Sequence, residues 1–170
     1  GIADHEEITI ATWLNWDGGN NWQRIFDFGN GPGQYLFLTP KGGNGQMRFV
    51  ILKDGVESVM DASSPSIGSW AHVAVTIGSG TARLYVNGTQ SSSVATTLKP
   101  SDIRPALNFI GDSQYPADPA FNGRLDEFVI FNRALSPAEI TAIKDGSSPA
   151  FIGDPVSRAA ASTGASYDQT

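Results

Sequence analysis

Turn-forming residues interrupt this chain about every eight to twelve residues, which leaves room for short strands and for few helices. Glycine, asparagine and proline crowd residues 29–33 and 40–45, and each of these stretches ends a run rich in aromatic and branched side chains. Asn87 and Gly88 form a dipeptide that favours the tight type I′ turn of a β-hairpin. The spacing therefore predicts an all-β chain whose antiparallel strands are joined by short turns.

The segments between the turns alternate apolar and polar side chains with the period of a β-strand. In the first segment Ile8, Ile10 and Leu14 fall on one face, because successive residues of a strand point to opposite sides. Strands are predicted at residues 8–16, 24–28, 35–39, 47–52, 56–60, 70–77, 82–86, 89–95, 107–111 and 125–131. This pattern is typical of an antiparallel β-sandwich or jelly roll and is not that of a parallel α/β fold.

One short helix is predicted near the C-terminus, directly after the last strand. Ser136 can cap its first turn, Pro137 needs no amide hydrogen at the first helical position, and Glu139 completes a Ser-x-x-Glu capping box. Gly146 ends the helix. The residues that follow are rich in serine and alanine, so we predict one domain over residues 1–148 and a linker over residues 149–170.

Composition narrows the classes of partner. The chain has 170 residues and no cysteine, and a domain of this length can bury a core without disulfides. Its formal charge is −6 and its 11 lysine and arginine residues are scattered, which argues against a nucleic-acid partner. No apolar run approaches the roughly 18 residues of a membrane span, so membrane insertion is not expected, and the first residues lack a signal-peptide pattern.

Five segments, in this order, carry a resemblance to a known family. They are residues 8–13, 22–29, 70–76, 83–88, and 123–128 continuing through 132–136. Over roughly residues 8–145 the chain resembles the laminin-G-like jelly roll of the concanavalin A-like lectin and glucanase superfamily, in the variant common in bacterial extracellular proteins. The resemblance implies an extracellular or cell-surface bacterial protein, and it is more specific for fold than for function.

The chain departs from that family at both ends. Family members usually open with one or two strands before the segment that corresponds to residues 8–13, which predicts an open sheet edge here. Residues 1–7 could fold back over it, but residues 4–7 are too polar to pack there. We therefore expect residues 149–170 to cover it, with a strand donated by another segment or chain as the alternative. Residues 151–156 and 164–167 also resemble the first strand of an immunoglobulin- or cadherin-like module, which implies neighbouring domains in a larger protein.

Aromatic side chains beside polar ones are the candidates for binding a polysaccharide or other glycan, because sugar rings lie on flat aromatic faces and hydrogen-bond to planar polar groups. Two tryptophans flank a polar, glycine-containing loop where burial is harder, whereas Trp13 and Trp70 are interpreted as core residues. The predicted carbohydrate-binding residues are Trp16, Trp22, Arg24, Asp27, Tyr35, Arg48 and Tyr115.

Asp126 and Glu127 could suggest the paired carboxylates of related glycosidases, but no second carboxylate lies two or four residues from Asp126. A retaining pair must share one surface at about 5 to 5.5 Å, so catalysis is not expected. We predict that Asp126 is a buried residue at a strand end, where it bonds loop amides or helps to hold a structural calcium ion. His72 is interpreted as a hydrogen-bonding strand residue.

The sequence therefore predicts a non-catalytic carbohydrate-binding accessory module of a secreted or surface-attached bacterial protein that could itself degrade polysaccharides. The alternative is a structural or adhesive spacer domain that has no sugar site and mediates protein contacts or assembly.

Overall fold

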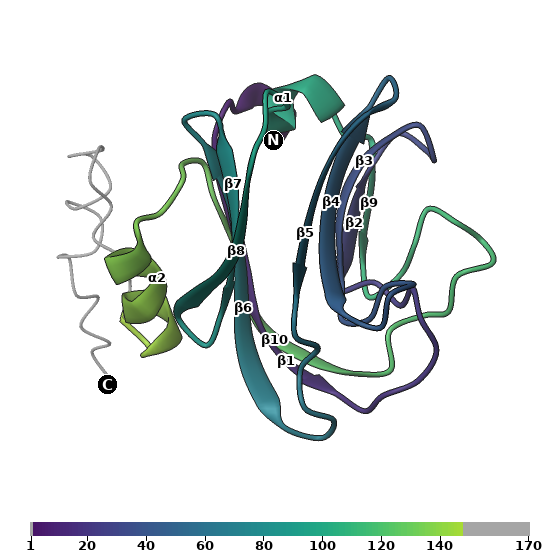
Figure 1. Cartoon of the computed structure of the whole chain (residues 1–170), viewed down its shortest axis with the longest axis vertical. Coiled ribbons are helices and arrows are strands. Elements are labelled where there is room, and N and C mark those ends of the chain that lie inside the picture. The colour runs from purple at the N-terminus through teal and green to yellow at the C-terminus, as the bar shows by residue number, and fades with distance from the viewer. Residues whose placement is uncertain (1, 148–170) are drawn as a thin grey trace, which may run out of the picture.

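The computed structural model describes residues 2–147, which form two five-stranded antiparallel sheets packed face to face (Figure 1). Sheet A has the order β10 (Gly123–Phe131), β1 (Ile8–Trp16), β6 (Trp70–Gly78), β7 (Thr81–Val86), β8 (Thr89–Ala95). Sheet B has the order β5 (Val56–Ala62), β4 (Met47–Lys53), β3 (Gln34–Thr39), β2 (Phe26–Gly29), β9 (Leu107–Ile110). The predicted antiparallel β-sandwich is confirmed.

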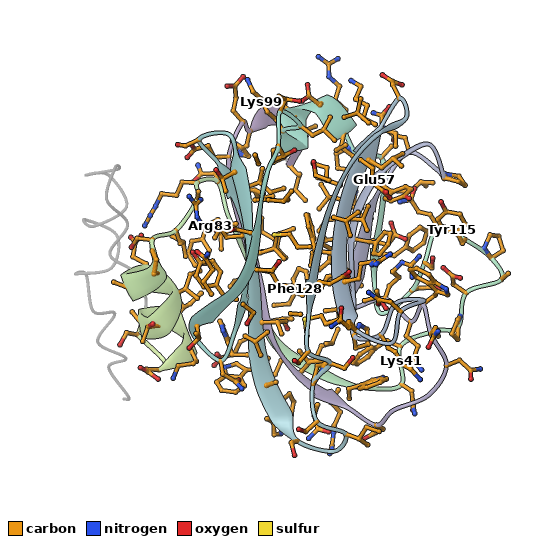
Figure 2. The ribbon with its side chains drawn as sticks, in the orientation of Figure 1. Lys41, Glu57, Arg83, Lys99, Tyr115 and Phe128 are labelled. Carbon is orange, nitrogen blue, oxygen red and sulfur yellow. The ribbon has the colours of Figure 1, made fainter. Side chains whose placement is uncertain are left out.

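The core lies between the sheets and is built mainly from alternate residues of β1 to β7. Ile8, Ile10 and Leu14 point inward from β1 and are buried, as predicted. Sheet B contributes Phe26 and Phe28, whose rings stack at 5.2 Å, and the ring of Phe128 from β10 meets both edge-on. Figure 2 shows Phe128 between the two layers, so β10 closes one side of the core.

The hairpin turns follow the chemistry of their residues. Asn87 and Gly88 have φ angles of 51° and 82°, as a type I′ turn requires, and they join β7 to β8. Asp54 and Gly55, at 50° and 80°, join β4 to β5 in the same way.

A β-bulge in β10 changes which side chains face the core. The pairing with β1 shifts between Ala11 and Trp13, and Glu127 has a φ of 49° in the left-handed region. Leu125 and Phe128 both pack against the core although they are three residues apart, because the bulge adds a residue between them. Asp126 is exposed as a result, so the prediction of a buried aspartate in phase with Phe128 was wrong.

The predicted helix is α2 (Pro137–Lys144), and its capping box is present. The amide of Glu139 donates to Ser136 Oγ at 3.3 Å, and the amide of Ser136 donates to the Glu139 carboxylate at 2.9 Å. A two-pronged ion pair with Arg133, together with Ser136, lowers the pKa of Glu139 to about 2. The helix covers the outer face of sheet A, where Tyr85 and Ile140 are fully buried.

Two further short helical segments, η1 (Ile2–Asp4) and α1 (Pro100–Ile103), were not predicted from the sequence and contact each other at one end of the sandwich. No helix within residues 2–147 is long and apolar enough to cross a membrane.

The edge strands β9 and β10 leave apolar side chains uncovered at the same side of the sandwich. Ile110 is 54% exposed and Ile130 is 45% exposed. Both line a cavity of about 440 Å³ that Ile2 and Ala3 of η1 border. The N-terminal segment thus reaches this edge, although we expected residues 149–170 to cover it. Those residues lie outside the described part of the chain, so their role, like strand donation, stays a prediction.

His72 is buried on the outer side of β6, against the edge of the Trp13 ring at 5.4 Å between ring centres. Its backbone amide donates to Asn87 Oδ1 at 2.9 Å, but its Nδ1 atom has no hydrogen-bond partner within residues 2–147. Burial, and then the positive charge of Lys144, lower the pKa of His72 to about 4. The imidazole is therefore neutral in the folded protein near neutral pH.

This buried imidazole predicts a pH dependence of stability. His72 has a pKa near 6.5 in the unfolded chain but about 4 in the folded protein, so between these pH values only the unfolded state binds the proton. The free energy of unfolding therefore decreases as pH falls from about 6.5 to about 4. Between pH 7 and pH 5 the free energy of unfolding should fall by about 1 to 2 kcal/mol more in the wild type than in His72→Gln. Urea unfolding at both pH values measures the difference; equal losses in the two proteins would contradict the prediction.

Candidate functional site

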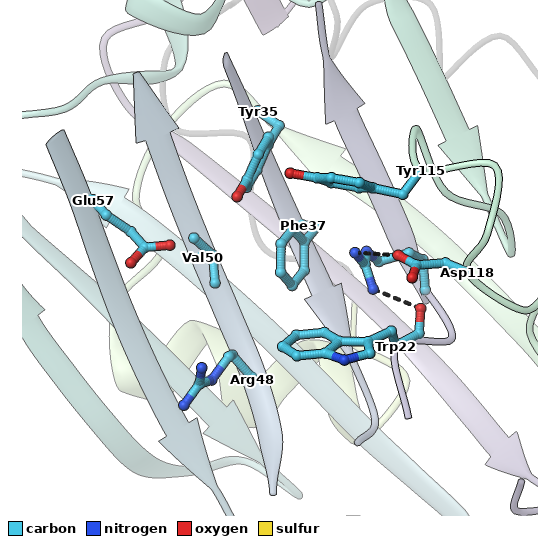
Figure 3. A pocket seen from close by; sticks show the side chains of 9 residues that line it. Trp22, Tyr35, Phe37, Arg48, Val50, Glu57, Tyr115 and Asp118 are labelled. Atoms are coloured by element: carbon cyan, nitrogen blue, oxygen red, sulfur yellow. Dashed lines mark hydrogen bonds and ion pairs between the residues drawn. The ribbon is translucent and has the colours of Figure 1, made fainter. Parts of the chain in front are cut away.

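A cavity of about 260 Å³ opens on the outer face of sheet B, the side turned away from sheet A (Figure 3). Figure 2 shows Tyr115 on this side of the molecule, in the loop of residues 111–122. The cavity is lined by Trp22, Arg24, Tyr35, Phe37, Arg48, Val50, Glu57, Tyr115 and Asp118.

The apolar floor follows from strand alternation. Tyr35 and Phe37 on β3 point outward, since the residues between and after them, Leu36 and Leu38, fill the core. Val50 on β4 lies opposite Phe37 in the sheet register, which extends the floor across two strands. In Figure 3 these side chains lie in the middle of the pocket. Tyr35, Phe37 and Val50 are buried, at 7%, 4% and 2% exposure, because Trp22, Arg24 and Tyr115 pack against them.

The guanidinium of Arg24 is 2% exposed and holds three parts of the pocket together. Its Nη2 donates to Asp118 Oδ2 at 2.8 Å, and its Nη1 donates to the carbonyl of Trp22 at 2.6 Å. Its Nε lies 3.4 Å from Asp27 Oδ2. The plane of the Phe37 ring lies under it, 4.0 Å from ring centre to Cζ. A buried cation needs such partners, because desolvation without them costs several kcal/mol.

Asp27 is fully buried beneath the loop of residues 111–122 and anchors it to β2. Gln114 donates twice to its carboxylate, from the backbone amide at 3.1 Å and from Nε2 at 2.6 Å. Ser113 Oγ bonds Asp118 at 3.0 Å and accepts from the amide of Tyr115 at 3.1 Å. The loop that carries the outer wall of the pocket is therefore held by a fixed charge in the sheet.

Gly29 makes this anchoring possible. A Cβ atom at this position would lie 2.6 Å from Gln114 Nε2 and 2.8 Å from the Cα of Tyr35, which is closer than real side chains approach. The nearest atom, the carbonyl oxygen of Gln34, would lie closer still, so glycine is required by the backbone of β3 as well as by the loop side chain.

Trp22 forms one wall and has an unusual backbone. Its φ angle is 72°, in the left-handed region that non-glycine residues rarely adopt. The amide of Trp22 donates to the carbonyl of Lys41 at 2.8 Å, and its ring lies against Gly43, where a Cβ atom would come within 2.9 Å. The Trp22 and Phe37 rings meet edge-on at 6.5 Å. The turn between β3 and β4 thus fixes the orientation of the indole.

Tyr115 forms the opposite wall (Figure 3). Its ring meets that of Tyr35 edge-on at 6.1 Å, and its hydroxyl donates to the carbonyl of Pro32 at 3.3 Å. Burial, and then the hydrogen bond with Tyr115, raise the pKa of Tyr35 far above its usual value, so this hydroxyl stays protonated.

The remaining rim is charged. Arg48 is joined to Asp61 by two parallel hydrogen bonds of 2.8 and 2.9 Å. This pairing raises the pKa of Arg48 and lowers that of Asp61, so both are charged at neutral pH. Glu57 is exposed across the floor from Asp118, as Figure 3 shows, and has no hydrogen-bond or ion-pair partner within the described residues.

The structure gathers most of the predicted carbohydrate-binding residues at one place. Trp22, Arg24, Tyr35, Arg48 and Tyr115 line the pocket. Asp27 lies directly beneath it as the loop anchor. Whether these residues bind a sugar stays a prediction.

Trp16 is the exception and was wrongly placed. It is 4% exposed, points into the core from β1, and donates from Nε1 to Gln23 Oε1 at 2.9 Å. The glycine-containing loop next to it does not expose its ring. Trp70, which we interpreted as core, is 46% exposed at the start of β6. Trp13 is only partly buried, on the outer side of sheet A against His72.

The sequence reasoning missed four lining residues. Phe37 and Val50 could have been found, since they lie in outward register with Tyr35. Glu57 and Asp118 carried no local signal, because their relevance depends on how β5 and the loop of residues 111–122 lie across the sheet.

The predicted metal ligand, Asp126, lies on β10 in sheet A, away from the pocket. Its Oδ1 accepts from the amide of Glu127, the next residue of the same strand, at 2.8 Å. This is not the bond to a loop amide that we predicted. In residues 2–147, no group of three or more histidine, cysteine, aspartate or glutamate side chains could hold a metal ion. The side chains around Asp126 do not form the cluster of carboxylates typical of a calcium site. Calcium binding at Asp126 stays a prediction.

Several solved structures share this fold. Domain 4 of AbnA, an extracellular arabinanase from Geobacillus stearothermophilus solved in complex with arabinotriose, matches with a TM-score of 0.69 and 21% identity, over 82% of this chain and 67% of that one. A sialidase module of Ruminococcus gnavus, CBM40 bound to α2,3-sialyllactose, matches with a TM-score of 0.68 and 19% identity, over 82% and 83% of the two chains. Identities this low establish a common fold alone.

A pentraxin from Limulus polyphemus, described as SAP-like and heptameric, is more distant, with a TM-score of 0.57 and 14% identity over 82% of this chain and 70% of that one. No curated protein is significantly similar to the chain in sequence. The family model described as the concanavalin A-like lectin/glucanases superfamily matches residues 2–141, the same region in which the sequence resembled it. With that match over most of its length and the jelly-roll sandwich observed, the chain belongs to the concanavalin A-like lectin/glucanases superfamily.

Proposed function

We propose that this protein is a carbohydrate-binding module and that the pocket on sheet B is its glycan site. The observation that carries the proposal is the pocket itself, with aromatic walls at Trp22 and Tyr115, an apolar floor and polar atoms at its rim. A sugar ring has apolar C–H faces and a polar edge, so it needs both kinds of surface. The similar modules solved with arabinotriose and sialyllactose support the same assignment.

The rigidity of the pocket favours binding. Arg24, Asp27 and the loop of residues 111–122 are tied together before any ligand arrives, so little conformational freedom remains to be lost. The left-handed backbone of Trp22 costs roughly 1 to 3 kcal/mol, and strain of this kind concentrates at functional sites. The indole of Trp22, held in one orientation on a strained backbone, would give a sugar ring a fixed surface to lie against.

We propose that the module is not an enzyme. A glycosidase needs one carboxyl group as a general acid and a second as nucleophile or base. Asp27 and Asp118 are both held by Arg24 and by the loop of residues 111–122, which suits them to a structural role. Glu57 alone cannot form such a pair.

We propose that the module is part of a secreted or cell-surface bacterial protein with further domains. The similar modules are likewise named as parts of larger proteins, an extracellular arabinanase and a sialidase. Its role there would be to hold the larger protein on a polysaccharide or glycan.

A structural or adhesive spacer remains a second candidate because of a separate observation. Ile110 and Ile130 are about half exposed on the adjacent edge strands β9 and β10. Exposed edges with apolar side chains invite pairing with another strand, so a protein contact at this edge would fit an assembly role. The two candidates use different surfaces and can be tested separately.

The aromatic walls supply the first test of the glycan site. Replacing Trp22 and Tyr115 by alanine should weaken retention in affinity electrophoresis on a polysaccharide panel by tenfold or more, because truncating such contacts typically costs about 1 to 3 kcal/mol. Trp70→Ala is the matched control, since it removes an exposed indole from sheet A. The control should retain the polysaccharide as the wild type does. If the double variant also retains it unchanged, the glycan site is not this pocket.

Asp27 tests whether the pocket must be held in shape. Asp27→Asn removes the charge that faces Arg24 and weakens one acceptor of Gln114, so the loop of residues 111–122 should open more often. We expect faster amide hydrogen exchange in that loop and weaker glycan retention, with β6 and β7 unaffected. Normal exchange in the loop together with normal retention would show that the anchor is dispensable.

A further inference from the structure

We infer that the pocket on sheet B, taken as the glycan site proposed above, selects uncharged sugars and rejects sugars that carry a carboxylate. The inference rests on that proposed function and concerns the charge of its ligand. It follows from how the two arginines of the pocket are paired and from one carboxylate that is not paired.

Arg24 is not accessible to an anionic ligand in its present position. Its two terminal nitrogens donate one hydrogen bond each, to Asp118 and to the carbonyl of Trp22, Asp27 lies beside its Nε, and its side chain is 2% exposed. A carboxylate is recognised best by a free, planar guanidinium that can donate two parallel hydrogen bonds. The most prominent cation of the pocket is therefore part of its scaffold.

Arg48 is the other cation of the lining, and one of its two-pronged faces is already occupied. Its Nε and Nη2 donate to the two carboxylate oxygens of Asp61, which also accepts from Asn44 Nδ2 at 2.9 Å. An acidic sugar could meet only the remaining N–H groups on Nη1 and Nη2, and it would then share one positive charge with the carboxylate of Asp61. A neutral hydroxyl could accept from the same N–H groups without bringing a second negative charge beside Asp61.

Glu57 adds an unpaired negative charge at the rim. It is exposed, lines the cavity and has no partner within residues 2–147. Its charge reaches the pocket, because it contributes to the raised pKa of Tyr35 after burial and the Tyr115 hydrogen bond. A second carboxylate brought beside it would be repelled, whereas a sugar hydroxyl could donate to it.

The charged groups of the pocket and of the residues directly behind it have a negative net charge. The lining holds two arginines, Arg24 and Arg48, and two carboxylates, Glu57 and Asp118. Two more carboxylates, Asp27 and Asp61, stand directly behind the arginines. No lysine or histidine lines the cavity to offset them. The free acceptors, Glu57 and the Oδ1 atom of Asp118, therefore suit neutral hydroxyl groups, while the aromatic walls contact the faces of the ring.

The test compares glycans that differ by a carboxylate. The protein would be applied to an array of neutral and acidic glycans that includes lactose with 3′-sialyllactose, and methyl-esterified with de-esterified oligogalacturonides. We expect the retained glycans to be uncharged, and the carboxylated counterpart of the tightest ligand to bind at least tenfold more weakly, which corresponds to about 1.4 kcal/mol. An acidic glycan that binds as tightly as its neutral counterpart would overturn the inference but leave the glycan site standing. Retention of no glycan at all would overturn the proposed function itself.

Three variants test whether the pocket charges cause the selectivity. Glu57→Gln removes the unpaired charge, and Asp61→Asn releases the two-pronged face of Arg48, so each should shift the ratio of acidic to neutral binding toward the acidic glycan by threefold or more. Glu127→Gln is the matched control, because it removes an equal charge from β10 in sheet A. Melting temperatures would confirm that all variants fold. Identical selectivity in the wild type and all three variants would show that the pocket charges do not set it.

Discussion

The paired, buried guanidinium of Arg24 is the interaction on which the pocket on the outer face of sheet B depends. It lies between the outer side of sheet B and the loop of residues 111–122, and it bonds a carboxylate from the loop while lying beside one from the sheet. Removing Arg24 would leave the fully buried carboxylate of Asp27 without its cation, and the loss of one partner of a buried ion pair typically costs about 3 to 5 kcal/mol. The loop is therefore fixed over the sheet by electrostatics, since only a small part of it reaches the apolar core.

The strands and turns could be predicted because their signals are local. The glycine-containing dipeptides force left-handed backbones at the hairpins, and alternation then sets the inward faces of β1 and β3. The bulge at Glu127 could not be predicted in the same way. It depends on how β10 pairs with β1, and a single extra residue was enough to place Asp126 on the opposite face from the one expected.

The tryptophans show which kind of reasoning succeeded at the candidate site. Trp16 shares the parity of Ile10 and Leu14 along β1, so alternation alone would have placed it in the core, where it lies. The argument from loop composition overrode that pattern and was wrong. For Trp22 the same argument led to a residue that lines the pocket, because Trp22 lies outside any strand and its left-handed backbone is fixed by the turn between β3 and β4. Loop composition is informative only for residues outside the strands, where the alternation of a strand makes no prediction.

The two outer faces of the sandwich are covered differently, and this difference leaves a pocket on one of them. On sheet A, α2 covers the outward row that includes Ala74 and Tyr85, so that surface is used for stability. On sheet B no helix covers the equivalent row within the described residues, yet Tyr35, Phe37 and Val50 are buried there too. The side chains of Trp22, Arg24 and Tyr115 lie against this row in place of a helix. Because a loop anchored by paired charges carries part of this cover, the face keeps a pocket of about 260 Å³ with an apolar floor and a polar rim.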